Sequence, residues 1–221
     1  MKNYHSTQKG FTLIEMIVSL AVFSTVITIA VGALLMLIGT NQRLQDEQTV
    51  MTNLSFALDS MTREIRTGTN YYCLSDDDID GGGAGQRIFE DGEDLDFSPT
   101  QDCVDGNNDS SPRRYHGMSF VESGQSITEV ANTRIAYFVD LTSGIMYRRI
   151  SGQAAEQITS SGLEVVHAEF FVTGSTRLVD GGAGADKQPT VTIVLEARDR
   201  TSESGETYHV QTTVTQRSAD L

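Results

Sequence analysis

A single carboxylate interrupts the apolar N-terminal part of the sequence. Between Phe11 and Gln42 every residue is uncharged except Glu15, and 27 consecutive uncharged residues run from Met16 to Gln42. At about 1.5 Å per residue, a helix of that length exceeds the roughly 30 Å hydrocarbon core of a membrane. A carboxylate inside a bilayer costs roughly 3 kcal/mol on insertion scales, and more without a partner. Glu15 therefore either pairs with a cation or reaches the lipid headgroups from the helix end.

A second group of carboxylates has the spacing of a calcium loop. Asp76, Asp78, Asp80 and Gly81 fit the opening D-x-D-x-D-G of an EF-hand-type loop, in which alternate carboxylates converge on one cation. The match is incomplete, because Arg87 takes the position of the bidentate Glu. Calcium held by the three aspartates would fold this loop, and the alternative is a solvated acidic segment without metal.

The two cysteines bracket most of this acidic segment, which spans residues 74–112. The segment holds twelve Asp and Glu residues against one Arg, a net charge of −11 (12 − 1) within the −14 of the whole chain. That sign of charge makes nucleic acid an unexpected partner. In an oxidising compartment, Cys73 and Cys103 would form a disulfide that stabilises the fold by roughly 3–4 kcal/mol. Two free buried thiols are the alternative.

No cluster of catalytic type stands out among the other reactive residues. His5, His116, His167 and His209 are scattered without metal-ligand spacing, and no nucleophile motif or phosphate-binding glycine loop is present. His167 and His209 fall in strand patterns and are interpreted as half-exposed sheet residues. We therefore do not expect an enzyme, and we expect no required cofactor beyond possible calcium.

The apolar run predicts a helix that stays with the protein. A cleaved secretory signal has an apolar region of only about 7–15 residues, which this run exceeds. Lys2 and Lys9 precede it without any acid, so the positive-inside bias leaves residues 1–10 in the cytoplasm and sends the C-terminus outward. The cysteines then reach an oxidising compartment, in agreement with a disulfide.

The helix continues beyond the membrane-length part. From residue 40 to about Arg66 the sequence has no Gly or Pro, and Gly68 is a plausible stop. Its apolar residues lie on one face at heptad-like spacing and should pack against a sheet. They are Leu44, Met51, Leu54, Leu58, Met61 and Ile65.

The rest of the chain predicts an antiparallel sheet of four to six strands. Alternating or β-rich runs form two hairpins and one further strand, at residues 133–140 with 144–150, 189–199 with 207–217, and 163–174. The fold class is therefore α+β: a long N-terminal helix packed on an antiparallel sheet, with a globular β-rich domain over residues 68–221. The acidic segment 74–112 is placed between helix and sheet.

The N-terminal residues resemble the type IV prepilin signal of pilins and type II secretion pseudopilins. The resemblance rests on the uninterrupted run Lys9-Gly10-Phe11-Thr12-Leu13-Ile14-Glu15, which follows a short basic leader and opens a helix of the right length. The segments LSFALDSMTREIR and TRIAYFVDLTSGIMYRR are similar to the minor pilin W and pseudopilin J group.

This resemblance implies roles for individual residues. A prepilin peptidase would recognise Lys9 and Gly10, remove residues 1–10 and N-methylate Phe11, which changes the formal charge from −14 to −16 by removal of two lysines. Residues 11–39 would form the transmembrane and filament-core helix. Glu15 would pair with the Phe11 amine of a neighbouring subunit and set its axial register.

The resemblance also implies a structural function. The chain would be a minor subunit of a type IV pilus or type II secretion pseudopilus that helps to initiate or cap assembly. Its partners would be the peptidase, other minor subunits and the major subunit. It would cross the inner membrane once, with its globular domain in the periplasm or outside the cell. Because the outermost subunit of such filaments tends to lack the carboxylate, Glu15 argues against the topmost position. The alternative is a membrane-tethered, calcium-dependent binding module or tip adhesin.

Overall fold

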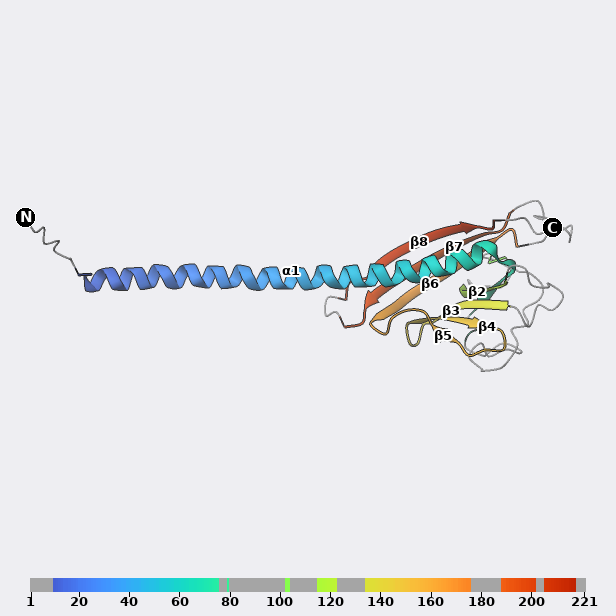
Figure 1. Cartoon of the computed structure of the whole chain (residues 1–221), viewed down its shortest axis with the longest axis horizontal. Helices are drawn as coiled ribbons and strands as arrows, with labels where there is room; N and C mark the ends of the chain where they lie inside the picture. The colour runs from blue at the N-terminus through green and yellow to red at the C-terminus, as the bar shows by residue number, and fades with distance from the viewer. Residues whose placement is uncertain are drawn as a thin grey trace, which may run out of the picture. The chain divides into compact units, whose positions relative to one another are not determined.

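A computed structural model describes residues 10–75, 79, 102–103, 115–122, 134–175, 188–201 and 205–217. The chain forms two compact units, Met1–Asp46 and Glu47–Leu221, and we call the second unit the head. Helix α1 (Leu13–Thr67) contributes to both units, and all strands belong to the head (Figure 1). The fold is α+β, which confirms the predicted class.

The head contains two antiparallel sheets, where a single sheet was expected. Sheet A has the order β1-β2-β3-β4-β5, and sheet B has the order β6-β7-β8. The strands of sheet A are β1 (Thr69–Ser75), β2 (Tyr115–Val121), β3 (Arg134–Asp140), β4 (Ile145–Ile150) and β5 (Glu156–Gln157). Those of sheet B are β6 (Leu163–Thr173), β7 (Thr190–Asp199) and β8 (Tyr208–Thr215). The β3–β4 and β7–β8 hairpins were both predicted.

The second half of α1 buries one face against both sheets. Its buried residues are Val50, Leu54, Ala57, Leu58, Met61 and Ile65, so four residues of the predicted apolar stripe lie in the core. Leu44 lies outside the head and is 49% exposed, and Met51 is only half-buried. The same core contains Phe120 and Tyr137 from sheet A and Phe170 and Ile193 from sheet B.

Helix α1 ends where the sequence predicted. The Gly68 N–H donates to the carbonyls of Glu64 and Ile65 at 3.0 and 3.1 Å. A side chain at Gly68 would collide with the buried ring of Phe120, so the close approach requires glycine there. The Tyr71 hydroxyl lies 2.8 Å from the Ile65 carbonyl and 2.7 Å from that of Gly68, which helps to satisfy the helix end.

Strand β1 follows the helix directly, which corrects the position of the acidic segment. Because β1 includes residues 74 and 75, the segment connects β1 to β2 and not the helix to the sheet. Asn70 has a left-handed φ of 54°, and the β1–β2 register shifts between Thr69 and Tyr72. This irregularity breaks the alternation that would have identified β1 in the sequence.

The outer edge of β6 is covered by backbone and side-chain groups from elsewhere in the head. Three hydrogen bonds reach it, each from a different segment. They are Val165 N–H to the Gly144 carbonyl at 2.8 Å, His116 Nδ1 to the Ala168 carbonyl at 2.7 Å, and Cys103 N–H to the Val172 carbonyl at 3.0 Å. Since a carbonyl only accepts, His116 carries its proton on Nδ1.

A half-buried polar network links α1 to sheet A. Arg148 donates to both carboxylate oxygens of Glu64, through Nε and Nη2, each at 3.0 Å. The Tyr137 hydroxyl donates to Glu64 Oε2 at 2.7 Å. Burial, followed by the hydrogen bond to Glu64 and the charge of that carboxylate, raises the pKa of Tyr137 well above its ordinary value of 10.0.

This raised pKa predicts an alkaline loss of stability that Tyr137→Phe should remove. A group whose pKa is higher in the folded state contributes its full stabilisation of that state at pH values below its unfolded pKa. For Tyr137 the contribution is therefore complete below about pH 10 and declines as the pH rises above that value. We expect the wild type to exceed Tyr137→Phe by about 1–2 kcal/mol in unfolding free energy at pH 8. Urea unfolding should show this difference shrinking at pH 11; a constant difference would contradict the assignment.

Candidate functional site

The N-terminal end of α1 has the hydrogen bonds of a helix cap. Gly10, Phe11 and Thr12 precede the helix, and the Thr12 Oγ1 accepts the Glu15 N–H at 3.4 Å. The Thr12 carbonyl accepts the Met16 N–H at 3.2 Å. Thr12 is therefore the N-cap residue and Glu15 the third helical residue, the T-x-x-E spacing of a capping box. This cap was not predicted, although the spacing of Thr12 and Glu15 indicates it.

The Glu15 carboxylate is exposed and has no hydrogen-bond or ion-pair partner among the residues that the structure describes. Its bond to Thr12 uses only the backbone N–H. A negative charge in the first turn is favoured by the partial positive charge of the helix N-terminus, but this effect is worth only about 0.3–1 kcal/mol. Within the described residues, the side chain is therefore left available to a cation from another molecule.

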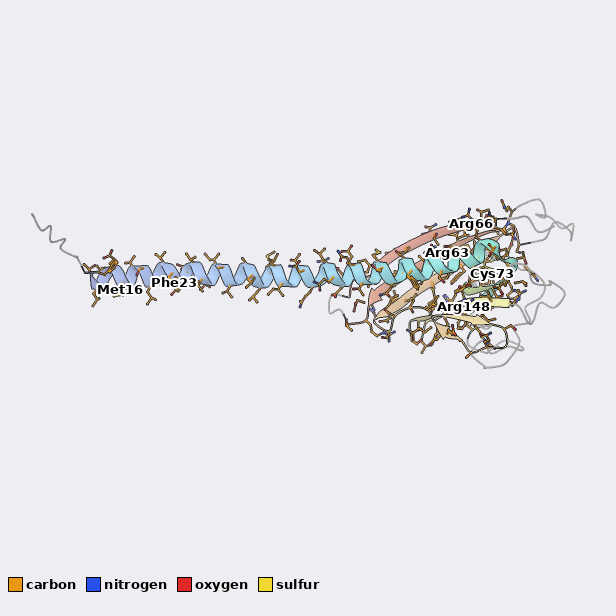
Figure 2. All side chains as sticks on the ribbon, in the orientation of Figure 1. Met16, Phe23, Arg63, Arg66, Cys73 and Arg148 are labelled. Carbon is orange, nitrogen blue, oxygen red and sulfur yellow. A yellow bond between two sulfur atoms is a disulfide. The ribbon has the colours of Figure 1, made fainter. Side chains whose placement is uncertain are left out.

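The apolar part of α1 exposes hydrophobic side chains on all of its faces. Met16 and Phe23 are each 62% exposed, and Figure 2 shows side chains projecting all around this part of the helix. The most apolar window of 18 residues has a mean hydropathy of 2.5, and none of it is buried inside the protein. By length and composition, α1 is able to cross a membrane.

Four of the polar side chains on the apolar part of α1 are satisfied by the helix itself. Ser19 donates to the Met16 carbonyl at 2.9 Å, and Thr28 donates to the Ser24 carbonyl at 2.8 Å. Thr25 and Thr40 form equivalent bonds one turn back. Because no water is available in a hydrocarbon core, hydroxyls in a membrane helix need such internal acceptors. The surface of this part of the helix thus suits an apolar surrounding, and Glu15 is its one charged residue.

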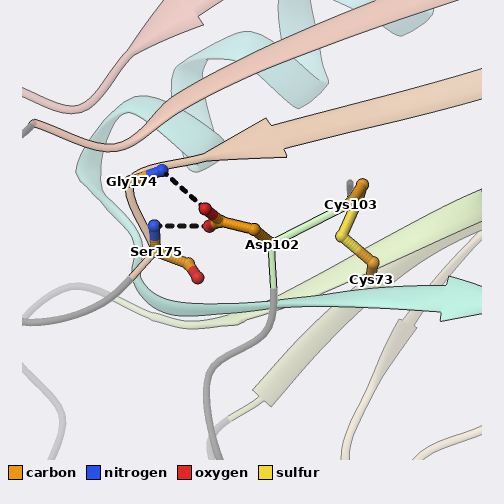
Figure 3. The surroundings of a disulfide bond; sticks show 5 residues. All are labelled: Cys73, Asp102, Cys103, Gly174 and Ser175. Carbon is orange, nitrogen blue, oxygen red and sulfur yellow. Dashed lines mark hydrogen bonds between the residues drawn. A yellow bond between two sulfur atoms is a disulfide. The ribbon is translucent and has the colours of Figure 1, made fainter. Parts of the chain in front are cut away.

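The disulfide connects Cys73 of β1 to Cys103, with their Cα atoms 5.5 Å apart (Figure 3). Next to it, the Asp102 carboxylate accepts the N–H of Gly174 at 3.1 Å and that of Ser175 at 2.7 Å. Together with the bond from Cys103 to the end of β6, these contacts attach residues 102–103 to both sheets. The sequence predicted the disulfide, but it gave no indication of the role of Asp102.

Other predicted site residues fall outside the described residues. These are Lys9 of the leader and the calcium candidates Asp76, Asp78 and Asp80. In the part of the chain that the structure describes, no group of three or more His, Cys, Asp or Glu is arranged to hold a metal ion. His167 Nε2 lies 3.7 Å from Glu169 Oε1, and 32% of the His167 side chain is exposed. His209 Nε2 lies 3.8 Å from Glu196 Oε1, and 69% of the His209 side chain is exposed.

Comparison with known proteins finds a similarity at the N-terminal end of the chain, where Glu15 lies. The model of the prokaryotic N-terminal methylation motif matches residues 5–31, which include Gly10, Phe11 and Glu15. No curated protein and no solved structure matched the chain. The motif is that of a type IV pilin-like precursor, which a prepilin peptidase processes, and such subunits are in general not enzymes. The methylation motif and the exposed apolar helix together fit a membrane-anchored pilin or pseudopilin precursor.

Proposed function

We propose that the chain is a minor pilin or minor pseudopilin that helps to initiate or cap a type IV pilus or type II secretion pseudopilus. The observation that carries this proposal is the Glu15 carboxylate in the first turn of α1, which has no partner among the described residues and is followed by an uncharged run. A membrane anchor alone has no use for this charge, whereas a subunit that docks beside another one does. The methylation motif over residues 5–31 supports the same assignment.

In this proposal the bond between Gly10 and Phe11 is hydrolysed on the cytoplasmic side. Gly10 presents an unhindered backbone to the peptidase, and Lys9 holds the bond at the membrane surface. Hydrolysis releases residues 1–10 and leaves a free amine on Phe11, which then receives a methyl group and remains cationic. On assembly this amine pairs with Glu15 of a neighbouring subunit, so two charges that are costly in an apolar surrounding neutralise each other.

The head lies on the outer side of the inner membrane in this proposal. The two lysines of the leader support a cytoplasmic N-terminus. The Cys73–Cys103 disulfide supports an oxidising compartment for the head, because the cytosol keeps thiols reduced. The head then contacts the heads of other subunits, while residues 11–39 pack in the filament core.

Mass spectrometry of the N-terminal peptide tests the proposal. Protein from native membranes or shed filaments should begin at Phe11 and carry one added methyl group. A Gly10→Val variant should retain its leader, since the β-branched side chain hinders the peptidase. The variant is a clean probe, because among the described residues nothing beyond the adjacent positions lies within 4 Å of the place that a Cβ of residue 10 would take. An intact leader on the wild type, in cells with active peptidase, would exclude the pilin assignment and favour the tethered calcium-binding module.

A further inference from the structure

The two outer strands of sheet B, β6 and β8, differ in the contacts that their outer edges make with the rest of the head. The outer edge of β6 forms the three hydrogen bonds described above: it donates to Gly144 and accepts from His116 and Cys103. On the opposite side of the sheet, β8 pairs only with β7 among the described residues. One edge of the sheet is therefore covered, whereas no described residue covers the other, which we call the open edge.

One hydrogen bond shows which residues of β8 direct their backbone N–H and C=O groups toward β7 and which direct them away. The Gln216 N–H donates to the carbonyl of Pro189, the residue opposite it if the β7–β8 register is continued by one step. Because hydrogen-bonded pairs alternate in an antiparallel ladder, even-numbered residues of β8 face β7 and odd-numbered residues face away. Arg217 agrees with this alternation, since its N–H donates at 2.7 Å to the Arg66 carbonyl of α1 and not to β7.

Four residues thus present their N–H and C=O groups at the open edge. They are His209, Gln211, Thr213 and Thr215, whose side chains are all exposed. Within the described part of the chain, none of their outward backbone groups has a partner. The register between β7 and β8 is continuous over eight residue pairs, so no bulge bends this edge away from an approaching strand.

The open edge also lacks the residues that usually block strand pairing. From Thr207 to Gln216 the sequence contains no Asp, Glu, Lys, Arg, Pro or Gly. Natural proteins protect exposed edges with charges, prolines, bulges or covering segments, because unprotected edges pair with other chains. In a chain with 46 charged residues (16 + 30), ten successive positions without charge make this strand suitable for contact with an uncharged partner.

We propose that the open edge of β8 binds an extended, uncharged strand of a neighbouring pilin-type subunit in the assembled filament. This inference rests on the proposed function. The main-chain groups of the four outward residues supply the hydrogen bonds, as in β-strand addition. The β8 side chains define the partner: Val210 and Val214 pack toward the core, whereas Gln211 and Thr213 lie on the outer face. The incoming strand therefore alternates apolar residues on the inner face with Ser, Thr, Asn or Gln on the outer face.

A matched pair of substitutions in the full-length chain tests this inference. Thr213→Pro removes an outward N–H and leaves the ladder to β7 intact, because proline is tolerated where the N–H faces away from the sheet. Thr213→Val keeps the N–H, and both variants lose the contact between the Thr213 and Thr192 hydroxyls at 3.0 Å. We expect Thr213→Pro to lower recovery in filaments at least about tenfold and Thr213→Val to leave it near the wild-type level. Equal recovery of the two variants would overturn the proposal.

Amide hydrogen exchange gives a readout that does not depend on variants. In the detergent-solubilised chain, the amides of His209, Gln211 and Thr213 should exchange faster than those of Val210 and Thr212. In the filament the outward amides should slow at least about 100-fold, including at 1 M NaCl, because the contact is not ionic. Unchanged fast exchange in the filament would overturn the proposal. N-terminal methylation, measured on the same samples, reports separately on the proposed function.

Discussion

Replacing Glu15 by Gln should nearly abolish incorporation into filaments while the protein still reaches the membrane. Gln has the same shape and keeps the backbone N–H that bonds to Thr12, so the helix cap remains. In the proposed assembly, Gln cannot neutralise the cationic amine of Phe11 on a neighbouring subunit, and that amine is then buried without a counter-charge. Removing one partner of a buried charge pair costs about 3–5 kcal/mol, which corresponds to at least about a 100-fold loss of incorporation.

The measurement compares the amount of each variant in shed filaments with its amount in membranes. Glu47→Gln is a suitable control, because it removes one exposed carboxylate from the same helix outside the apolar part. Its incorporation should equal that of the wild type. Should Glu15→Gln enter filaments at the wild-type level, Glu15 would be only a helix-end charge that reaches the headgroups.

The second large effect is expected from the disulfide. The double variant Cys73→Ala/Cys103→Ala should lower the unfolding free energy of the head by about 3–4 kcal/mol, as the chain-entropy model predicts for a loop of this length. The two cysteines are 30 residues apart in sequence, and both are buried: Cys73 is 1% exposed and Cys103 is 4% exposed. The loss is large against the total stability of a domain, which is about 5–15 kcal/mol.

Urea unfolding of the full-length protein in detergent, followed by near-ultraviolet circular dichroism of the tyrosines, measures this loss. Reductant should destabilise the wild type to a similar extent and leave the double variant unchanged, which separates the bridge from the packing of the two side chains. Equal unfolding midpoints for the wild type and the double variant would show that the contacts of Asp102 hold residues 102–103 in place without the bridge.

The regular parts of the fold were predictable because their residues have strong periodicity. The long apolar run identifies α1, Gly68 marks its end, and the heptad-like stripe gives four of its six buried residues. In β7, buried and half-buried positions alternate from Thr190 to Ala197, so the period of two is visible in the sequence. The β3–β4 hairpin was predictable for another reason. Six of the seven residues of β3 are buried, but its run is rich in β-branched and aromatic residues, and a short turn at Gly144 joins it to β4.

The missed strands lack this periodicity for physical reasons. All seven residues of β2 are buried, so no polar positions alternate with its apolar ones, and Gly117 is present because the backbone of Phe138 and Tyr137 leaves no room for a side chain. The division into two sheets could not be seen in the sequence, and neither could the three bonds along the outer edge of β6. Their partners are far apart in the sequence and follow from tertiary packing.

The candidate site was predictable in its residues but not in its geometry. Gly10, Phe11 and Glu15 follow from the order of charge, glycine and apolar run. The structure alone reveals that the Glu15 side chain has no partner among the described residues, whereas the hydroxyls of Ser19 and Thr28 have one. The open edge of β8 likewise required the direction of its backbone groups.

The bridge between Cys73 and Cys103 also closes the backbone between them into a covalent ring. A protease that hydrolyses one peptide bond inside this ring adds a water molecule but releases no fragment. The nicked protein therefore keeps both pieces attached until the sulfurs are reduced. On a denaturing gel, a nick in this segment stays hidden without reductant and gives two bands with it. If the head lies outside the cytoplasm, as proposed, a cut in this acidic segment thus does not release the rest of the head from helix α1.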